Sequence, residues 1–410
     1  MKNNLVVLAA AIGLAFSTSG CSAQKGVAPA VANNATLAPV ETRAPNTNYK
    51  PAFAGQTRVA GVQTKTPYTT KVLTDGLKGP WGITTLPDGR FLITQKSGVM
   101  KIASTDGTLS GDITGLPEVN SKGQGGLLGV TIDPDFSKNR MVYWTFSENT
   151  PQGNLTAVAK GRLSNDEKTI ENAKVIYQAT PAYKGTLHYG SRILFDKKGN
   201  LIFSTGERSD LETRPQAQDL NSSLGKIIRI TTDGKPAPGN PFIGRSGAKP
   251  ELYSYGHRNV QGLALNPATG DLWESEFGPR GGDEINLIQP GKNYGWPTIT
   301  YGIEYAGPKV GEGIQQKSGM EQPVYYWDPV LSPSGITFYS GNAIPEWHNN
   351  LFVGGLNGNH IARLVIKNNK VVGEERLLVK EDQRFRDITQ GKDGALYTVT
   401  DQGRLYRIGK

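Results

Sequence analysis

The side chains in this sequence best suited to take up a proton near neutral pH are its four histidines. His188 opens one predicted strand pair, and Glu207 follows the second strand of that pair. A carboxylate placed there could orient the imidazole and stabilise its charge. His348 follows a tryptophan in a turn and His360 begins a strand-like run, which indicates structural roles. His188 is therefore the candidate general base, with a packed loop histidine as the alternative.

A second group of candidate residues lies between positions 252 and 297. His257, Arg258 and Asn259 offer donors suited to an anionic or carbonyl-rich ligand. The loop 278–284 then offers backbone carbonyls and two carboxylates, the hard oxygen ligands that Ca²⁺ prefers. Hydrogen-bond donors next to a loop that could bind a cation suggest a site that holds an anionic cofactor through a metal ion. A capped hairpin with a Gly-rich turn is the alternative.

The sequence lacks the motifs of several common enzyme and binding classes. It contains no serine-hydrolase elbow, Walker loop, dinucleotide fingerprint or His/Cys zinc cluster. The formal net charge of +9 and the pI near 9.3 would suit nucleic acid. The positive charge is scattered, however, and no basic run or nucleic-acid-binding motif is present. We therefore expect no nucleic-acid partner.

The N-terminal residues predict export. A short basic start is followed by an apolar run over residues 5–16, which is too short to span a bilayer. Small residues up to Gly20 then precede Cys21, the only cysteine, and this arrangement resembles a bacterial lipoprotein signal. Because Ser22 rather than Asp follows, we expect a periplasmic protein whose only membrane contact is a lipid on Cys21, anchored in the outer membrane. Secretion with cleavage nearby is the alternative.

Composition divides the chain into three parts. Residues 1–20 are the predicted lipoprotein-type signal peptide. Residues 21–64 are rich in Ala, Pro, Asn and Thr and lack a hydrophobic period, so they offer too little apolar area to offset the entropy of ordering. We predict that they form a disordered tether without chemistry. Residues 65–410 are the predicted folded domain.

The folded part repeats a unit of two short strands. Residues 81–94 show it most clearly, because the Asp88-Gly89 turn between them is a strong hairpin signal. Closely similar units cover residues 191–203 and 387–397, and looser copies begin at Leu127, Asn259 and Ser334. Six such units with turn signals and no amphipathic helix predict an all-β fold, a six-bladed β-propeller. Two β-sandwich domains are the alternative.

The predicted ring defines where a ligand would bind. Residues 68–73 could close the ring by pairing with residues 404–408. In a propeller the innermost strands face a central channel, and ligands bind where the loops leading into those strands converge. These loops are polar or Gly-rich at residues 124–126, 188–190, 257–259 and 384–387. A purely structural propeller has no reason to place a Gln, two His and three Arg there, so we predict a site.

Six segments that occur in order resemble one family. They are GLLGVTIDPDF, HYGSRILFDKKGNLIFSTGE, AQDLNSSLGKIIRI, YGHRNVQGLALNPATGDLW, FGPRGGDEINLIQPGKNYGWP and RFRDITQGKDGALY. Through them the chain from about residue 70 to 410 resembles the soluble quinoprotein sugar dehydrogenases, the pyrroloquinoline quinone (PQQ)-dependent aldose dehydrogenases of the glucose/sorbosone dehydrogenase family. The resemblance implies a propeller that holds PQQ and Ca²⁺ on its top face. It also implies oxidation of an aldose at C1 to the lactone, with electrons passed to a respiratory acceptor such as a quinone or cytochrome.

The resemblance also assigns roles to individual residues. His188 is similar to the family's general base and Glu207 to its acidic partner. The residues similar to the PQQ-contacting groups are Gln124, His188, Arg258, Asn259, Arg384 and Arg386. PQQ is a tricarboxylate, and guanidinium groups suit both its carboxylates and its planar ring. The calcium ligands implied beside PQQ are Gly278 and Pro279, and those implied for a further, structural calcium are Glu284 and Tyr294.

Four positions depart from the pattern that the resemblance implies. Glu207 stands where Asp is usual, and Leu187 precedes the histidine where some members have Asp. Asn357 lies near the place of a PQQ-contacting Lys, and Gly239 replaces an Asp. A non-catalytic propeller lipoprotein that binds a carbohydrate or a protein partner is therefore the second hypothesis. A lactonase-like hydrolytic propeller is a third, and it needs more calcium-binding carboxylates and Asn than the sequence places together.

Overall fold

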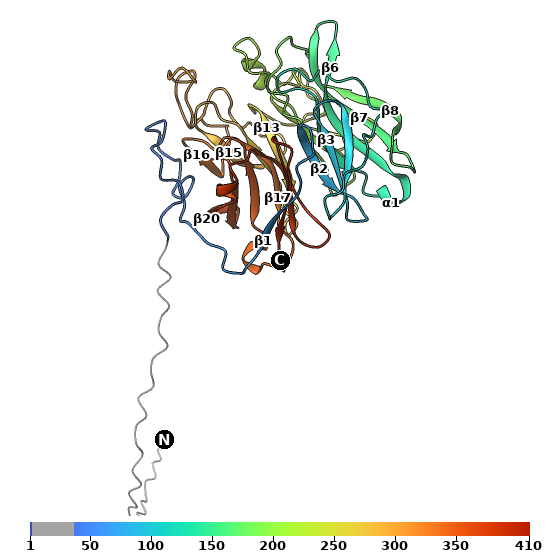
Figure 1. Ribbon diagram of the computed structural model, residues 1–410. Helices are drawn as coiled ribbons and strands as arrows, with labels where there is room; N and C mark the ends of the chain where they lie inside the picture. Colours follow the sequence, from blue (N-terminus) through green and yellow to red (C-terminus); the bar gives the residue numbers. More distant parts are fainter. Residues whose placement is uncertain (2–36) are drawn as a thin grey trace, which may run out of the picture. The chain divides into compact units, whose positions relative to one another are not determined.

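The chain folds into six antiparallel sheets of three or four strands, arranged as the blades of a propeller (Figure 1). The computed structural model describes Met1 and residues 37–410. The innermost strands are β2 (Pro80–Thr85), β5 (Leu127–Ile132), β9 (Ile193–Phe195), β13 (Val260–Leu265), β17 (Pro333–Phe338) and β21 (Phe385–Gln390). We number the blades 1 to 6 in this order.

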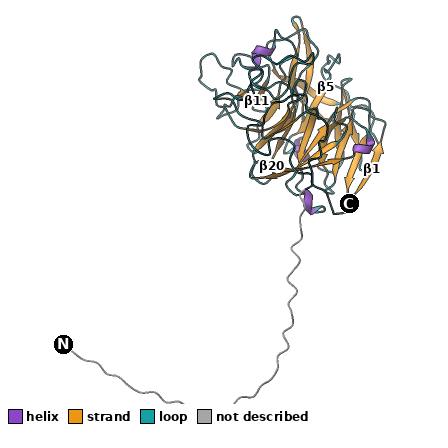
Figure 2. Cartoon of the chain, turned by 90° about the vertical axis from the view of Figure 1, so that its left-hand side faces the viewer, coloured by secondary structure: helices purple, strands orange, loops and turns teal. Residues whose placement is uncertain are grey.

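The remaining strands follow outward in each blade. The second strands are β3 (Phe91–Gln95), β6 (Met141–Thr150), β10 (Leu201–Ser204), β14 (Leu272–Glu276), β18 (Leu351–Gly355) and β22 (Leu396–Thr400). The third strands are β4 (Val99–Ala103), β7 (Gly153–Leu163), β11 (Lys226–Ile230), β15 (Asp283–Ile288), β19 (Ile361–Lys367) and β23 (Leu405–Gly409). The outer strands are β8 (Ile170–Gln178), β12 (Leu252–Tyr255), β16 (Tyr325–Trp327), β20 (Lys370–Leu377) and β1 (Thr69–Thr74). The helical segments are α1 (Phe136–Asn139) and the 3₁₀ turns η1 (Arg214–Ala217), η2 (Pro345–Trp347) and η3 (Val379–Glu381), all short beside the strands (Figure 2).

The blades form a closed ring. The innermost strands contact one another in a cycle, β2 with β5, β5 with β9, β9 with β13, β13 with β17, β17 with β21, and β21 with β2. In blade 6 the outer strand β1 pairs with β23 from the far end of the chain and places Thr69 opposite Gly409. The predicted six-bladed β-propeller and its closing strand pair are thereby confirmed. Two β-sandwich domains are excluded.

Each blade begins with the hairpin that the sequence repeats predict. Gly89 and Gly394 take left-handed backbone angles (φ 91° and 78°) in the tight turns of blades 1 and 6. The second strand β3 is buried along its whole length, because both of its faces lie against neighbouring blades. One hydrophobic cluster fills each of the six interfaces between adjacent blades. The core is therefore a ring of interfaces rather than one central mass.

Buried side-chain hydrogen bonds also join the blades around the channel. At four interfaces a hydroxyl on a second strand donates to a backbone carbonyl at or just before the next innermost strand. These bonds run from Thr94 to Leu128 (2.5 Å), Thr145 to Ser191 (2.6 Å), Ser204 to Val260 (2.9 Å) and Ser275 to Ser334 (2.7 Å). The Ser334 hydroxyl donates across to the carbonyl of Phe385 at 2.5 Å, and Asp387 accepts from the backbone N–H of Ile83 at 2.9 Å. All six interfaces are linked, so the loops leading into the innermost strands are held in fixed relation.

The prediction of a disordered tether over residues 21–64 is wrong for residues 37–64. We call residues 37–64 the N-terminal strap. The backbone N–H of Gly61 donates to Leu37 at 3.2 Å, and the strap joins blade 5 where Thr64 donates to the Glu375 carboxylate at 2.6 Å. Arg58 also donates to the backbone carbonyl of Asp328 at 2.8 Å. The strap is ordered by polar anchors to the propeller, which an argument from apolar area alone does not count.

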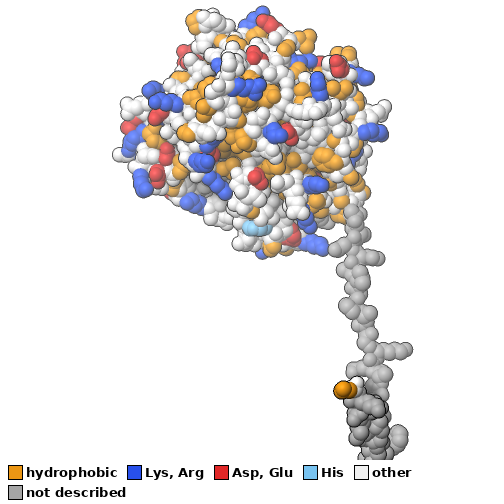
Figure 3. All heavy atoms as spheres, turned by 180° about the vertical axis from the view of Figure 1, so that it is seen from behind, with side chains coloured by type: hydrophobic (Ala, Val, Ile, Leu, Met, Phe, Trp, Pro, Cys, Tyr) orange, Lys and Arg blue, Asp and Glu red, His pale blue; other side chains and the backbone are white. Residues whose placement is uncertain are grey.

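The surface and the N-terminus bear on the predicted location. Basic and acidic side chains are interspersed over the face seen in Figure 3. Within the described part of the chain, no helix is long and apolar enough to cross a membrane. The predicted signal peptide and the predicted lipid on Cys21 lie almost entirely within residues 2–36, outside the described residues. The outer-membrane location therefore stays a prediction from the sequence.

Candidate active site

His188 and Glu207 form a buried hydrogen-bonded pair. His188 lies in the loop before β9, in the left-handed region with φ 47°, and Glu207 lies three residues after β10. The Nδ1–H of His188 donates to Oε1 of Glu207 at 2.5 Å, and the backbone N–H of Ser209 donates to the same oxygen at 2.8 Å. The backbone N–H of His188 donates to the side chain of Gln124 at 2.8 Å. Nε2 of His188 is left without a hydrogen-bond partner among the residues described.

Burial sets the protonation state of this pair. Burial lowers the pKa of His188 to about 4. The nearby positive charge of Arg258 also lowers this pKa, whereas Glu207 acts to raise it. Burial acts to raise the pKa of Glu207, but the hydrogen bond from His188 and the surrounding positive charge hold that pKa below its usual value. At pH 7 the imidazole is neutral and the carboxyl group is ionised. These are the states that a general base and its orienting partner need.

A buried arginine that the sequence analysis missed holds the His188 loop in place. Arg208 donates to the backbone carbonyls of Leu187 at 3.0 Å and Gly185 at 2.5 Å, and to the side chain of Asn154 at 2.6 Å. Its guanidinium also stacks over the ring of Tyr189, with 4.0 Å from its central carbon to the ring centroid. Because Arg208 directly follows Glu207, the same turn positions the carboxylate and clamps the loop that carries the imidazole.

The loop before β13 brings Arg258 and Asn259 to the site but turns His257 away from it. His257 is fully buried, stacks on Tyr294 with 4.8 Å between ring centroids, and donates from Nδ1 to Glu276 at 3.1 Å. The other carboxylate oxygen of Glu276 accepts from the backbone N–H of Arg258 at 2.6 Å. The expectation that His257 offers a donor to a ligand is therefore wrong. Its ring is used in packing, and Glu276 holds the whole loop in place.

Two polar groups of this loop have no partner although they are buried. Asn259 accepts from the backbone N–H of Gly190 at 2.9 Å, but its own Nδ2 donates to nothing in the described part of the chain. Nε of Arg258 is likewise buried and unpaired, while its Nη1 donates to the carbonyl of Gly278 at 2.8 Å. Unpaired buried donors are costly, so these atoms indicate a missing acceptor at this position.

Blade 6 contributes a pair of arginines that share one carboxylate. Arg384 donates from Nε to Asp401 at 2.9 Å, and Arg386 makes two bonds to the same carboxylate at 2.7 and 2.9 Å. Arg384 also donates to the side chain of Asn357, which places this neutral residue beside the arginine pair. Two guanidinium groups against one carboxylate leave net positive charge. Asp401 was missed because a bulge between Phe385 and Asp387 shifts the register of this hairpin and brings Asp401 opposite Arg384.

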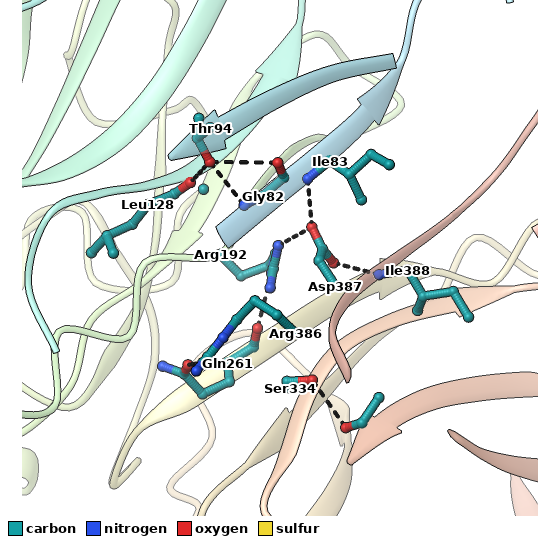
Figure 4. A network of polar contacts seen from close by, with 12 residues as sticks. Gly82, Ile83, Thr94, Leu128, Arg192, Gln261, Ser334, Arg386, Asp387 and Ile388 are labelled. Carbon is teal, nitrogen blue, oxygen red and sulfur yellow. Dashed lines mark hydrogen bonds and ion pairs between the residues drawn. The ribbon is translucent and has the colours of Figure 1, made fainter. Parts of the chain in front are cut away.

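Figure 4 shows the polar network around Arg192 and Asp387. Arg192 pairs with the carboxylate of Asp387 and donates from Nε to the backbone carbonyl of Gln261 at 2.9 Å. The side chain of Gln261 accepts from Arg386 at 3.4 Å and donates to the carbonyl of Gly190 at 2.9 Å. The network therefore ties the loops of blades 3, 4 and 6 together beneath the arginines.

The loop 278–282 is a candidate cation site formed by backbone carbonyl oxygens. A Cβ on Gly278 would come within 2.3 Å of the carbonyl oxygens of Gly281 and Gly282, so only glycine fits there. Its N–H donates to buried Asp283 at 3.0 Å, and burial raises the pKa of Asp283 to about 6. The carbonyl of Gly278 keeps a second lone pair beside its bond from Arg258, and that of Pro279 accepts no bond among the residues described.

A buried acidic cluster lies behind that loop on paired strands β14 and β15. Glu276 lies opposite Glu284 in the strand register, and Glu274 projects from the same face two residues earlier. Burial, together with the charge of Glu276, raises the pKa values of Glu274 and Glu284 well above the usual range. Ligand atoms of His257, Glu274 and Glu276 lie within 4.8 Å of one another. Tyr294 and Glu284 line one small cavity, but the Tyr294 hydroxyl is already bonded to the backbone of Leu287 and Gln289.

Some of the predicted site residues line two adjoining cavities, whereas Arg258 lines the small cavity of Glu284 and Tyr294, and Glu207 and Asn259 line none of the three. The larger, of about 380 Å³, is lined among others by Gln124, His188, Gly278, Pro279, Asn357 and Arg384. The smaller, of about 200 Å³, shares Gln124 and Arg384 and adds Trp81, Gln261 and Arg386. The neutral imidazole of His188, the guanidinium of Arg384 and the backbone of Gly278 and Pro279 thus line the larger cavity together. Such a space suits an anionic ligand and a hydroxyl group that loses a proton.

Fold and site together define a six-bladed propeller with an arginine-lined cavity next to its innermost strands. Residues 77–407 match the family described as Glucose / Sorbosone dehydrogenase, and the chain belongs to that family.

Relatives with known names agree with this family. The aldose sugar dehydrogenase YliI of Escherichia coli (strain K12) is 41% identical over 343 residues, covering 82% of this chain and 92% of that protein. The apo crystal structure of the soluble aldose sugar dehydrogenase from Escherichia coli superposes with a TM-score of 0.80 at 40% identity, covering 84% and 99% of the two chains. The PQQ-bound aldose sugar dehydrogenase of Streptomyces coelicolor gives 0.70 at 31% identity, covering 85% and 99%.

Proposed function

We propose that this protein is a quinoprotein oxidoreductase that uses PQQ and Ca²⁺ to oxidise an aldose at its C1 hydroxyl to the lactone. One observation carries the proposal. The free Nε2 of His188, on an imidazole that is neutral at pH 7, faces the same cavity as the arginine-rich wall. The similarity to an aldose sugar dehydrogenase and to a relative solved with PQQ supports it.

The residues present fit PQQ as a ligand. PQQ carries three carboxylates, and Arg258 Nε and Asn259 Nδ2 are unpaired buried donors next to the site, although neither residue lines its two cavities. Arg384 and Arg386 add net positive charge, because Asp401 is the one carboxylate that both of them contact. Charge-assisted bonds of this kind are about twice as strong as neutral ones. These groups would hold the cofactor by its carboxylates.

The fit to calcium rests on two places. The carbonyls of Gly278 and Pro279 are hard oxygen ligands at the cavity wall, where a cation would act as a Lewis acid beside the cofactor. Behind them, Glu276 lies opposite Glu284 on paired strands, and burial followed by the charge of Glu276 raises the pKa of Glu284. We propose that a second, structural cation binds near Glu284 and Tyr294.

The protein's own groups account for the proton in this reaction. When bound, PQQ would supply the two-electron acceptor for the hydride that leaves C1. Nε2 of His188 takes the C1 hydroxyl proton, and Glu207 holds Nδ1–H in place and stabilises the imidazolium that forms. Loss of one hydride and one proton converts the cyclic aldose to a lactone. We propose that the electrons then pass to a respiratory quinone or cytochrome.

Reconstitution tests the proposed function directly. The apo-protein supplied with PQQ and Ca²⁺ should reduce a redox dye in the presence of an aldose panel, and chelator should abolish this. Arg386→Ala should weaken PQQ binding about tenfold to a hundredfold, the effect of one charge-assisted bond. Arg407→Ala is the matched control. Arg407 lies on strand β23 of the same blade, pairs with Asp393 and lines neither cavity. PQQ binding without turnover of any aldose would instead leave a non-catalytic propeller.

The pH dependence of kcat should report the lowered pKa of His188. A base works only when it is unprotonated, so a pKa of about 4 keeps His188 active throughout the neutral range. The rate should stay level as pH falls from 7 to about 5 and drop as pH falls through about 4. Glu207→Gln removes the carboxylate that acts to raise the pKa of His188. The acid limb of the pH profile should therefore move to lower pH, and kcat should fall. An acid limb near pH 6.5 in the wild type would contradict this assignment.

A further inference from the structure

The N-terminal strap reaches the larger cavity of the site. Asn46 lines that cavity together with Gly278, Pro279 and His188. The strap precedes the region that matches the family, which begins at residue 77. One wall of the cavity therefore comes from a segment outside the family-defining part of the chain.

Polar contacts hold this part of the strap firmly against the propeller. The carboxylate of Asp328 accepts from the backbone N–H of Asn46 at 2.8 Å, and from the N–H and hydroxyl of Thr47 at 3.2 and 3.1 Å. Arg43 donates to the backbone carbonyl of Val330 at 3.2 Å, and Arg58 donates to the carbonyls of both Arg43 and Asp328 at 2.8 Å. The strap is thus fixed at both sides of Asn46.

The side chain of Asn46 keeps one polar atom for a ligand. Its Nδ2 donates to the carbonyl of Pro329 at 3.0 Å, whereas its Oδ1 accepts no hydrogen bond from any described residue. It also lies against the loop of the implied calcium ligands, since a Cβ on Gly281 would come within 3.2 Å of Nδ2. No described hydrogen bond joins the strap to His188 or Glu207. Asn46 therefore faces the ligand space without being part of the proton-accepting pair.

We propose that the N-terminal strap forms one wall of the sugar subsite and that Oδ1 of Asn46 accepts a hydrogen bond from a sugar hydroxyl other than the one at C1. The proposal rests on the proposed function. A carbonyl oxygen of an amide suits a hydroxyl donor, and the cavity that it faces also holds the free ring nitrogen of His188. This contact sets the affinity for the sugar and the choice among sugars, and leaves the chemical step alone.

Three variants of the full chain test the proposal. Asn46→Ala should raise KM for the preferred aldose about fivefold, the effect of one neutral hydrogen bond, with kcat unchanged. Asn48→Ala is the matched control, because this asparagine is exposed and has no described side-chain bond. Thr47→Val loses a bond to Asp328 but keeps Asn46, so it separates loosening of the strap from loss of the direct contact. Hydrogen exchange of residues 43–49 with and without aldose shows whether the strap stays docked and gains protection on binding.

The outcomes separate this proposal from the proposed function. A KM rise in Asn46→Ala alone, together with protection of the strap amides by aldose, supports the proposed role of the N-terminal strap in the sugar subsite. Equal KM values in Asn46→Ala and the wild type, or an equal rise in Asn48→Ala, overturn it. If the wild type binds aldose in calorimetry without turning it over, the proposed function fails. The proposed role of the N-terminal strap is then tested by the dissociation constants for aldose of the same variants. If no aldose binds at all, both fail.

Discussion

Replacing His188 by alanine is expected to lower kcat for the preferred aldose by about two to four orders of magnitude, the usual contribution of a positioned general base. The imidazole is neutral at pH 7, its Nδ1–H is fixed by Glu207, and its Nε2 faces the cavity. No other histidine among the described residues lines either of the two cavities, so no substitute base is at hand. Steady-state dye reduction with PQQ and Ca²⁺ saturating measures the effect.

His348→Ala is the matched control for this variant. His348 is exposed in the turn after η2 and lies outside both cavities. It should retain wild-type kcat. The PQQ affinity of His188→Ala, measured by fluorescence titration, should change far less than its kcat. A large loss of cofactor binding with the turnover of bound enzyme preserved would assign His188 to binding rather than to proton transfer.

Replacing Asp387 by alanine is expected to destabilise the apo-protein by about 3–5 kcal/mol, the cost of leaving a buried charge without its partner. Both side chains of the Arg192–Asp387 pair are buried. Asp387 also accepts from the backbone N–H groups of Ile83 and Ile388, each at 2.9 Å, and so joins the first and last blades of the ring. Equilibrium unfolding in urea measures the loss as a lower transition midpoint.

Two further variants isolate the charge in this effect. Ser275→Ala removes a neutral inter-blade link at the equivalent interface of blades 4 and 5, and should cost only about 1 kcal/mol. The double replacement Arg192→Met with Asp387→Leu removes both charges, and it should recover a large part of the stability lost in Asp387→Ala. If Asp387→Ala costs no more than Ser275→Ala, the pair is not the stabilising link that its burial indicates.

The hairpins show which features can be predicted from local sequence. Asp88-Gly89 and Gly394 specify tight turns between short apolar runs, and such signals depend only on neighbouring residues. Their repetition predicts the ring of blades. Ring closure could be predicted as well. The first strand and the last strand of the chain would each have an unpaired edge, and pairing with each other satisfies the hydrogen bonds of both. His188 and Glu207 were placed at one site for the same reason, since both flank one hairpin.

The residues that the sequence analysis missed or misplaced are those whose burial and hydrogen-bond partners depend on how loops and blades pack together. His257 looked like a ligand donor, but the structure buries it against Tyr294 and bonds it to Glu276. The strap looked disordered because its stabilising partners are carboxylates such as Asp328, separated from it by more than 280 residues. A local pattern contains no information about such partners.

The all-β repeat, the number of blades and the polar loops at the channel could all be predicted from the amino-acid sequence. These features arise from turn geometry and from strand alternation, which act over a few residues. The folded arrangement of the blades sets the protonation of His188 and leaves the donors of Arg258 and Asn259 unpaired. It also places Asn46 in the cavity wall. The physical reason is that burial and long-range pairing set charge states and free hydrogen-bonding groups, and both exist only once the ring has closed.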